Sequence, residues 1–184
     1  MKSKILLKIA TALFLAAGIF FGLVRYVQPI FFSEMSRNTK EDWLQGNWNE
    51  LSKDAKNLQN ISRSAKEEAI GLYWQGVAEN RKRNHAGAKE YQLQAIKLWP
   101  EYFAAHASLA NAYTNLGETD KSYEHAQKCI QIEPTYAWCY QALMNYYYVT
   151  GDISSAQINA KKAAELDPNN KELAEIYIEI LKYK

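Results

Sequence analysis

The residues best suited to metal or redox chemistry in this 184-residue chain are its two cysteines and three histidines. The histidines, His85, His106 and His125, are too dispersed for a metal-ligand pattern, and no Cys-x2-Cys pair accompanies them. No serine stands in a nucleophile elbow, and no glycine-rich stretch has the lysine of a phosphate loop. The sequence therefore predicts no catalytic residue, no metal site and no cofactor, and we expect a protein that is not an enzyme.

The two cysteines allow a different chemistry. Cys129 lies at the end of one predicted helix, and Cys139 lies one turn into the next. A tight turn brings such positions together, so a disulfide would form in an oxidising compartment. Cys129 also fills a position at which small residues recur, where a buried thiol would serve equally. The sequence leaves both interpretations open.

Charge argues against a nucleic-acid partner. The chain has 22 basic and 20 acidic residues, but the segment 1–28 holds four of the bases and no acid, which leaves 18 against 20 for the remainder. Nucleic-acid binding rests on clustered positive charge. We therefore expect the partner to be another protein.

An apolar run near the amino terminus predicts a membrane anchor. Ile5 to Val27 covers 23 positions, and about 20 residues span a bilayer. We expect residues 1–28 to form a transmembrane signal anchor in the inner membrane, followed by a linker over 29–38. Three lysines precede the span, so the amino terminus is predicted to stay in the cytoplasm and the rest to be periplasmic or otherwise extracytoplasmic.

Three alternatives to this anchor stay open. A cleaved signal peptide would release a secreted protein, although Leu23-Val24-Arg25-Tyr26 offers no small-x-small cleavage site. A eukaryotic membrane with the folded part in the cytosol is another. Gly18 and Gly22 form a small-xxx-small pair that would let two anchors pack into a homodimer, but glycine is also common in spanning helices.

The rest of the chain repeats with a period of about 34 residues. Pro100, Pro134 and Pro168 are evenly spaced at this period, and Gly117 and Gly151 have the same spacing. Small residues recur in the same frame, in the two series Ala88, Ser122, Ala156 and Ala95, Cys129, Ala163. Apolar residues at helical spacing predict two helices in each unit. The expected class is all-α, built from antiparallel helix pairs.

This pattern resembles the tetratricopeptide repeat, a helix pair of about 34 residues. Three units match within 64–170, at about 69–102, 103–136 and 137–170. The sequence departs from the family pattern where His106 and Tyr140 replace the usual tryptophan and Glu79 replaces a tyrosine. Residues 39–63 look like a degenerate repeat or amino-terminal cap, and 171–184 like a closing helix with Glu172 mostly on its outer side. The resemblance implies a solenoid of three repeats plus caps.

In such a solenoid the first helix of each unit lines a concave groove. Amides there would pair with a peptide backbone, and aromatic rings would supply contact energy. Packing into the core is the alternative for each aromatic residue, whereas a core would have to satisfy the amides of Asn111 and Asn145. Arg81 also faces the groove. The predicted peptide-groove residues are Tyr73, Val77, Asn80, Asn111, Thr114, Asn115, Trp138, Gln141, Asn145 and Tyr148.

These features together predict a membrane-anchored adaptor or scaffold. Its groove would bind a peptide segment of another envelope protein, itself membrane-bound or exported, and assist assembly of a membrane-associated complex. The layout is similar to that of membrane-anchored bacterial envelope proteins with tetratricopeptide repeats. A homo-oligomeric scaffold without a specific groove ligand is the alternative.

Overall fold

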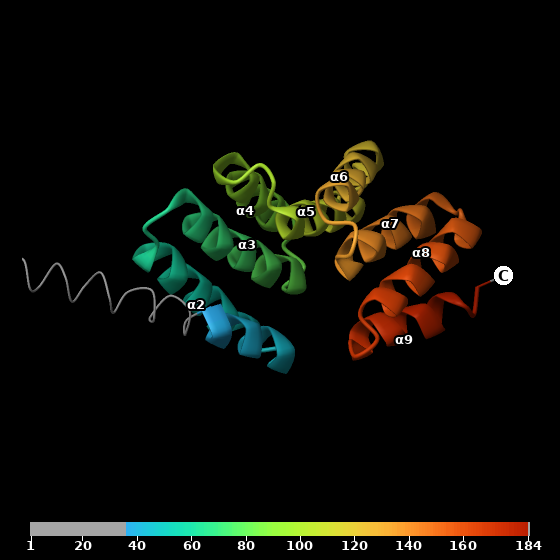
Figure 1. Cartoon of the computed structure of the whole chain (residues 1–184), viewed down its shortest axis with the longest axis horizontal. Helices are drawn as coiled ribbons and strands as arrows, with labels where there is room; N and C mark the ends of the chain where they lie inside the picture. The colour runs from blue at the N-terminus through green and yellow to red at the C-terminus, as the bar shows by residue number, and fades with distance from the viewer. Residues whose placement is uncertain (1–35, 184) are drawn as a thin grey trace, which may run out of the picture.

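The computed structural model describes residues 36–183, and this part of the chain consists of helices and turns without a strand (Figure 1). The all-α class is therefore confirmed for these residues. No helix within this range is both long enough and apolar enough to cross a membrane. The predicted anchor over 1–28, with Gly18 and Gly22, lies outside the described residues.

The helices come in consecutive pairs. Residues 36–45 form the first helix of the described part, so residues 36–38, which the sequence analysis assigns to a linker, are helical. Gly46 then turns the chain into α2. The remaining elements are α2 (Trp48–Ile61), α3 (Ala65–Arg81), α4 (His85–Leu98), α5 (Phe103–Asn115), α6 (Thr119–Ile132), α7 (Ala137–Thr150), α8 (Ile153–Leu166) and α9 (Lys171–Ile180).

The repeat period is reproduced in the second helix of each unit. Helices α4, α6 and α8 begin at His85, Thr119 and Ile153, which have the same spacing as the three repeated prolines. Each helix ends two residues before one of these prolines, and the residue preceding each proline is not helical, with ψ between 74° and 88°. Steric contact with the proline ring disfavours helical backbone at that residue. The three prolines therefore occupy equivalent corners, as the repeat predicts.

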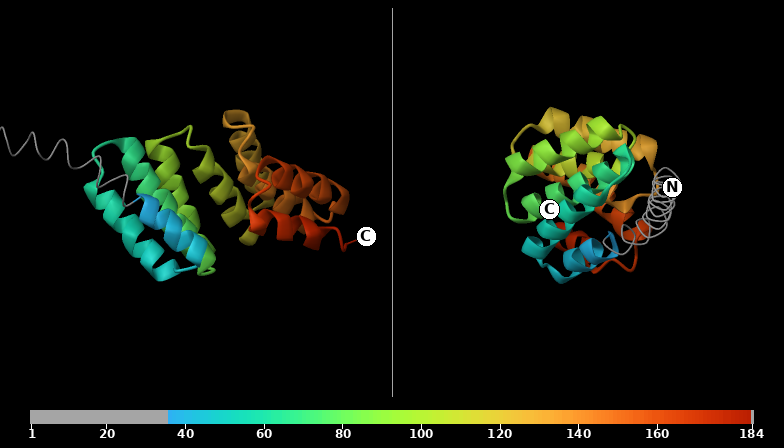
Figure 2. Two further views of the ribbon diagram at one scale, coloured as in Figure 1. Left: turned by 60° about the horizontal axis from the view of Figure 1, so that its bottom comes forward. Right: turned by 90° about the vertical axis from the view of Figure 1, so that its left-hand side faces the viewer.

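The first helices of the three units form a common layer. Each helix packs against its neighbour in the chain, and in addition α5 packs against α7 and α3 touches α5. Figure 1 shows the pairs following an arch from α2 to α9. The end-on view of Figure 2 places α2 and α9 on the same side of the molecule. We call the side of α3, α5 and α7 that faces the middle of this arch the inner face.

Small buried residues hold each pair together. The recurring residues Ala88, Ala95, Ser122, Cys129 and Ala156 are all fully buried, and larger side chains there would push the paired helices apart. Side chains cap the starts of several helices, among them α3 and α9. The Ser64 hydroxyl accepts the N–H of Glu67, and the Asn170 side chain accepts the N–H of Leu173.

Arg83 occupies a backbone position that suits glycine. Its φ is 64°, and Gly117 and Gly151, which follow at the repeat spacing, have φ of +76° and +85°. A left-handed backbone costs a residue with a Cβ roughly 1–2 kcal/mol, and the greater freedom of glycine in the unfolded chain offsets part of any gain. We therefore expect Arg83→Gly to raise the free energy of unfolding by about 0.5 kcal/mol in urea denaturation.

The matched control is Gly117→Arg. A Cβ added at Gly117 would meet no atom within 4 Å, so only the backbone conformation is tested. This variant should lose about 1 kcal/mol of stability. Unchanged stability in both variants would show that the turn does not impose the left-handed conformation.

Candidate functional site

The inner face carries a ladder of amides between α5 and α7. The Nδ2 of Asn111 donates to Oε1 of Gln141 at 2.9 Å, and the Nδ2 of Asn145 donates to Oδ1 of Asn111 at 2.8 Å. Asn115 donates to the carbonyl of Asn111. Neighbouring repeats therefore satisfy part of these amides themselves. Because each primary amide has two N–H groups and a carbonyl, the ladder uses only part of its capacity.

On α3, the predicted groove residues are engaged in packing. The ring of Tyr73 packs against that of Tyr102, with 5.3 Å between the centroids and 60° between the planes. Its hydroxyl forms a hydrogen bond with Tyr136, and burial raises the pKa of its phenol. Val77 is only 9% exposed and lies in a cluster with Leu51. Core packing, the alternative that the sequence left open for the aromatics, therefore describes Tyr73.

Two further predicted groove residues reach toward the second helix of their own unit. The Oδ1 of Asn80 lies 2.6 Å from Nδ1 of His85 at the start of α4. The hydroxyl of Thr114 donates to the carbonyl of Ala110 and lies 2.6 Å from the hydroxyl of Ser122 on α6. The structure thus places Thr114 between α5 and α6, where it is buried, and not on an open surface.

The aromatic residues of α7 differ in exposure. Trp138 is half-buried and packs over the two cysteines, and its ring meets the edge of Trp43 at 5.7 Å. Tyr148 is 39% exposed and contacts the ring of Tyr183 beyond α9. Among the predicted groove residues, Asn115 and Tyr148 are the exposed ones. They mark the most accessible part of the inner face.

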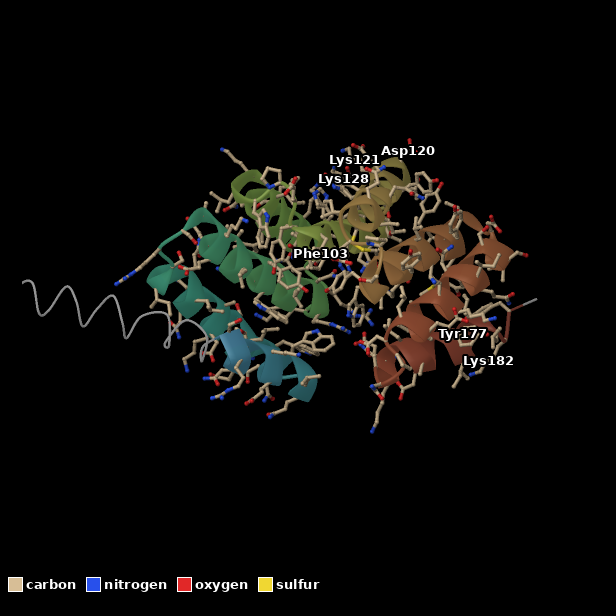
Figure 3. All side chains as sticks on the ribbon, in the orientation of Figure 1. Phe103, Asp120, Lys121, Lys128, Tyr177 and Lys182 are labelled. Carbon is tan, nitrogen blue, oxygen red and sulfur yellow. A yellow bond between two sulfur atoms is a disulfide. The ribbon has the colours of Figure 1, made fainter. Side chains whose placement is uncertain are left out.

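The start of α5 lies in the middle of the arch, where Figure 3 labels Phe103. Its ring meets that of Tyr136 at 4.8 Å, so the beginning and the end of the second unit are in contact. Lys121 and Lys128 lie along α6 at the opposite, outer edge in the same view. The inner face is thus aromatic and amide-rich at its centre, while these α6 charges lie away from it.

Two residues outside the predicted set of peptide-groove residues connect the ends of the arch. The Nη2 of Arg81, at the end of α3, donates to both carboxylate oxygens of Glu172 at 2.7 and 2.9 Å. The guanidinium lies 5.7 Å from the ring of Trp43 and 5.4 Å from that of Trp48. The prediction that Glu172 lies on the outer side of α9 is wrong, because this residue faces Arg81. No local pattern could reveal a contact between residues so far apart in the chain.

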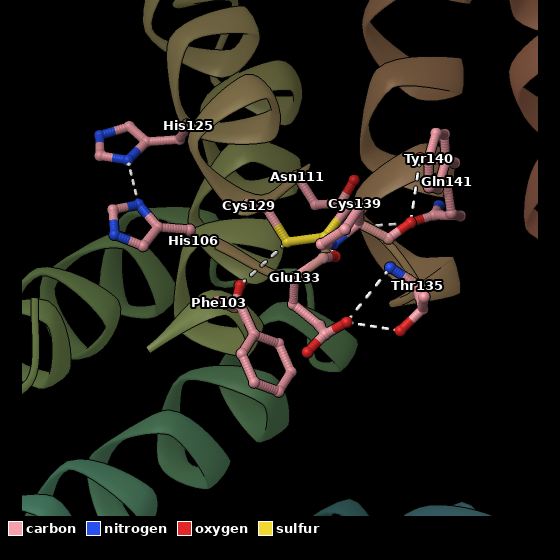
Figure 4. Close-up of a disulfide and its surroundings, with 11 residues drawn as sticks. Phe103, His106, Asn111, His125, Cys129, Glu133, Thr135, Cys139, Tyr140 and Gln141 are labelled. Atoms are coloured by element: carbon pink, nitrogen blue, oxygen red, sulfur yellow. Dashed lines mark hydrogen bonds between the residues drawn. A yellow bond between two sulfur atoms is a disulfide. The ribbon is translucent and has the colours of Figure 1, made fainter. Parts of the chain in front are cut away.

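Cys129 and Cys139 form a disulfide with a Cα–Cα distance of 5.5 Å (Figure 4). Both residues are fully buried. Ala95 and Ala105, one repeat earlier, are both buried in a single cluster at the equivalent corner. The bond therefore occupies a place where the second helix of one unit regularly meets the first helix of the next.

His106 of α5 and His125 of α6 face each other (Figure 4). Their Nδ1 atoms lie 2.9 Å apart, and Nε2 of His106 lies 2.9 Å from the carbonyl oxygen of Pro100. Burial lowers the pKa of both rings, and with the neighbouring His106 it brings the pKa of His125 to about 4. Lys128 also lowers the pKa of His106, whereas Glu124 opposes the shift at His125. Within residues 36–183 no third ligand joins them to form a metal site.

Acid should therefore destabilise the protein through this pair. The folded state binds fewer protons than the unfolded state between the ordinary histidine pKa of about 6.5 and about 4, so stability falls as the pH falls through this window. After allowing for the partial exposure of the rings, we expect a loss on the order of 1 kcal/mol. The measurement is urea unfolding at pH 7 and pH 4.5 for the parent and for His125→Gln. Equal pH dependence in the two proteins would contradict the assignment.

Comparison with known proteins identifies the type of repeat. Residues 103–136, which span α5, α6 and the corner after them, match the family model described as the tetratricopeptide repeat. The described chain folds as a tetratricopeptide repeat solenoid. The matched unit is the middle of the three that the sequence predicts. No curated protein matches this chain.

Solved structures share the tetratricopeptide repeat fold. A thermophilic tetratricopeptide repeat protein of Thermus thermophilus is similar with a TM-score of 0.70 and 16% identity, over 81% of this chain and 80% of that one. The tetratricopeptide repeat domain of Arabidopsis OM64 has a TM-score of 0.56 and 17% identity, over 66% of this chain and 100% of that one. The MamA RS-1 double mutant has a TM-score of 0.54 and 17% identity, over 82% of this chain and 93% of that one. At such identities the likeness establishes the fold alone.

Proposed function

We propose that this protein is a membrane-anchored adaptor whose inner face binds a peptide segment of another envelope protein and assists assembly of a membrane-associated complex. Tetratricopeptide repeat proteins are protein-interaction scaffolds and in general not enzymes, which supports a role in binding another protein. The observation that supports peptide binding at the inner face is the amide ladder of Asn111, Gln141 and Asn145 beside the exposed ring of Tyr148.

This combination suits a peptide in an extended or helical conformation. The remaining N–H and C=O groups of the ladder offer both donors and acceptors to a peptide backbone. Tyr148 and the half-buried Trp138 offer flat apolar contact beside the ladder, and aromatic residues often dominate the energy of an interface. Binding would therefore depend on backbone pairing along α5 and α7 and on an apolar side chain near Tyr148.

Two features support an extracytoplasmic location. The apolar run Ile5 to Val27 has the length of a membrane span and is preceded by lysines. The disulfide between Cys129 and Cys139 fits an oxidising compartment. Protease treatment of intact cells and spheroplasts tests this location, since the proposal requires digestion only after the outer barrier is removed. A freely released protein would favour the secreted alternative, and digestion only after lysis would favour a cytosolic one.

Site-specific photocrosslinking in membranes tests the adaptor function. A photoreactive amino acid at Tyr148 should yield a crosslinked species containing a second, different protein. The matched control is the same amino acid at Ile158, which is 68% exposed on α8. Asn145→Ala should reduce the crosslink from position 148, because it removes one member of the ladder. Equal crosslinking from positions 148 and 158 would contradict binding at the inner face.

A homo-oligomeric scaffold is the second candidate. Large apolar side chains are exposed near the carboxyl-terminal end, among them Val149, Ile178 and Leu181. Exposed apolar patches often mark contacts between proteins. In the same crosslinking experiment this function would yield a species that contains only this chain, at twice its mass.

A further inference from the structure

The two ends of the arch are joined by side chains that we call the clasp: Trp43, Arg81, Trp138 and Glu172. Trp43, from the helix over 36–45, meets Trp138 of α7 edge to face, with 83° between the ring planes. Arg81 of α3 holds Glu172 in the first turn of α9. Residues that are far apart in the chain therefore meet across the opening of the inner face.

The clasp can open without unfolding a repeat. Helices α3 and α9 are not among the helix pairs that pack extensively in the described part of the chain, so these two helices meet through long side chains. The side chains of Arg81 and Glu172 are 34% and 35% exposed. Exposed ion pairs of this kind contribute little to stability because water competes for both partners. The contact is therefore strong enough to set a preferred arrangement and weak enough to be replaced.

The clasp also shows what chemistry its surroundings prefer. The guanidinium of Arg81 is held near the rings of Trp43 and Trp48, which keeps its donors directed at Glu172. A carboxylate is the acceptor that suits these guanidinium donors. The ring of Trp138 takes an aromatic neighbour in Trp43. The chain itself thus places one carboxylate and one aromatic ring at the mouth of the inner face.

We propose that the clasp occupies the place of the partner, and that the partner segment carries an acidic side chain near an aromatic one. On binding, the acid replaces Glu172 at Arg81 and the aromatic ring replaces Trp43 at Trp138. This inference rests on the proposed function and adds the class of segment that is recognised. The displaced Glu172 stays in the first turn of α9, where a helix amino terminus favours negative charge.

Peptide binding to the full chain, measured by fluorescence polarisation in detergent, tests the proposal. The probes are blocked, labelled alanine peptides that carry one glutamate and one tryptophan, separated by zero to three alanines. Matched peptides carry glutamine or lysine in place of the glutamate. Blocked ends ensure that the only carboxylate is the side chain under test. The protein variants are Glu172→Gln, Arg81→Gln and, as control, Glu165→Gln, whose exposed ion pair with Lys161 lies within α8.

Glu172→Gln should strengthen binding of the best glutamate peptide about threefold to tenfold, because more of the protein is then open to it. Arg81→Gln should weaken it by about tenfold, since it removes the charged donor. Glu165→Gln should change nothing, and the glutamine and lysine peptides should bind the parent at least about tenfold more weakly. The peptide comparison uses the parent alone, so it does not depend on the folding of a variant.

Three results would overturn the proposal: weaker or unchanged binding in Glu172→Gln, equal binding of lysine and glutamate peptides, or no binding of any peptide. These outcomes differ from failure of the adaptor function. A foreign protein crosslinked at Tyr148 together with any of these results would reject only the clasp as the place of the partner. Absence of both a crosslinked protein and peptide binding would reject both proposals.

Discussion

Replacing Cys129 and Cys139 together by alanine should lower the free energy of unfolding by about 2–3 kcal/mol. The disulfide closes a loop with a sequence separation of 10, and restricting a loop of that length in the unfolded chain gives an effect of this size. The alanines should cost little else, since Ala95 and Ala105 already fill the equivalent corner one repeat earlier. Urea denaturation under oxidising conditions measures the difference.

Reduction supplies the control for this experiment. Dithiothreitol should destabilise the parent by a similar amount and leave the double alanine variant unchanged. Mass spectrometry of the purified protein should show a gain of two hydrogens on reduction. A parent that is insensitive to the reductant and shows no such gain would establish two free thiols in place of the bond.

Gly71→Ala should detach the amino-terminal pair of helices, at a cost of about 2–3 kcal/mol. A Cβ at this position would lie 2.9 Å from the backbone nitrogen of Gln59 and 3.1 Å from the carbonyl oxygen of Ala55. Both contacts are with the backbone of α2, so α2 must move away from α3. Amide hydrogen exchange should accelerate over residues 48–61, while α5 to α8 keep their protection. Since alanine otherwise favours a helix, any loss of stability must come from the clash.

A second glycine provides the comparison. A Cβ at Gly76 would meet mainly the side chain of Gln92, at a clashing distance from its Nε2. Gln92→Ala should therefore reduce the cost of Gly76→Ala, whereas Gln59→Ala should not reduce the cost of Gly71→Ala. Equal rescue of the two glycine variants would show that α2 is not held by its backbone.

The repetition in the sequence was enough to predict the outline of the fold. The spacing of Pro100, Pro134 and Pro168 marks three corners, and the helices α4, α6 and α8 follow it residue by residue. Small residues such as Ala88 and Ser122 predict where paired helices touch. These features are local or recur at a fixed period, so a single sequence reveals them. The proposed inner layer of α3, α5 and α7 follows from the same period.

Contacts between distant side chains could not be predicted in the same way. From the sequence, the amides of Asn111 and Asn145 were expected to be available in a groove, but in the structure they pair with each other. This pairing depends on how closely α5 and α7 approach, which the repeat pattern does not show. The position of Glu172 depends on the summed rotation of every unit between α3 and α9. The left-handed backbone at Arg83 could not be predicted from the residue type, and only its alignment with Gly117 and Gly151 in the repeat suggests it. The period predicts which helix carries a residue, but the curvature of the whole arch decides what that residue meets.

The three corners of the solenoid are built alike, yet within the described residues only one of them contains a disulfide. At the other two, Ala95 lies with Ala105 and Ala163 lies with Leu173. A cross-link can thus enter such an array by two point replacements without a change of backbone path. The bond ties the end of α6 to the start of α7 and therefore restricts movement of the middle unit relative to the last one. Reduction of the bond would remove this one covalent restriction and leave the packing between the helices in place.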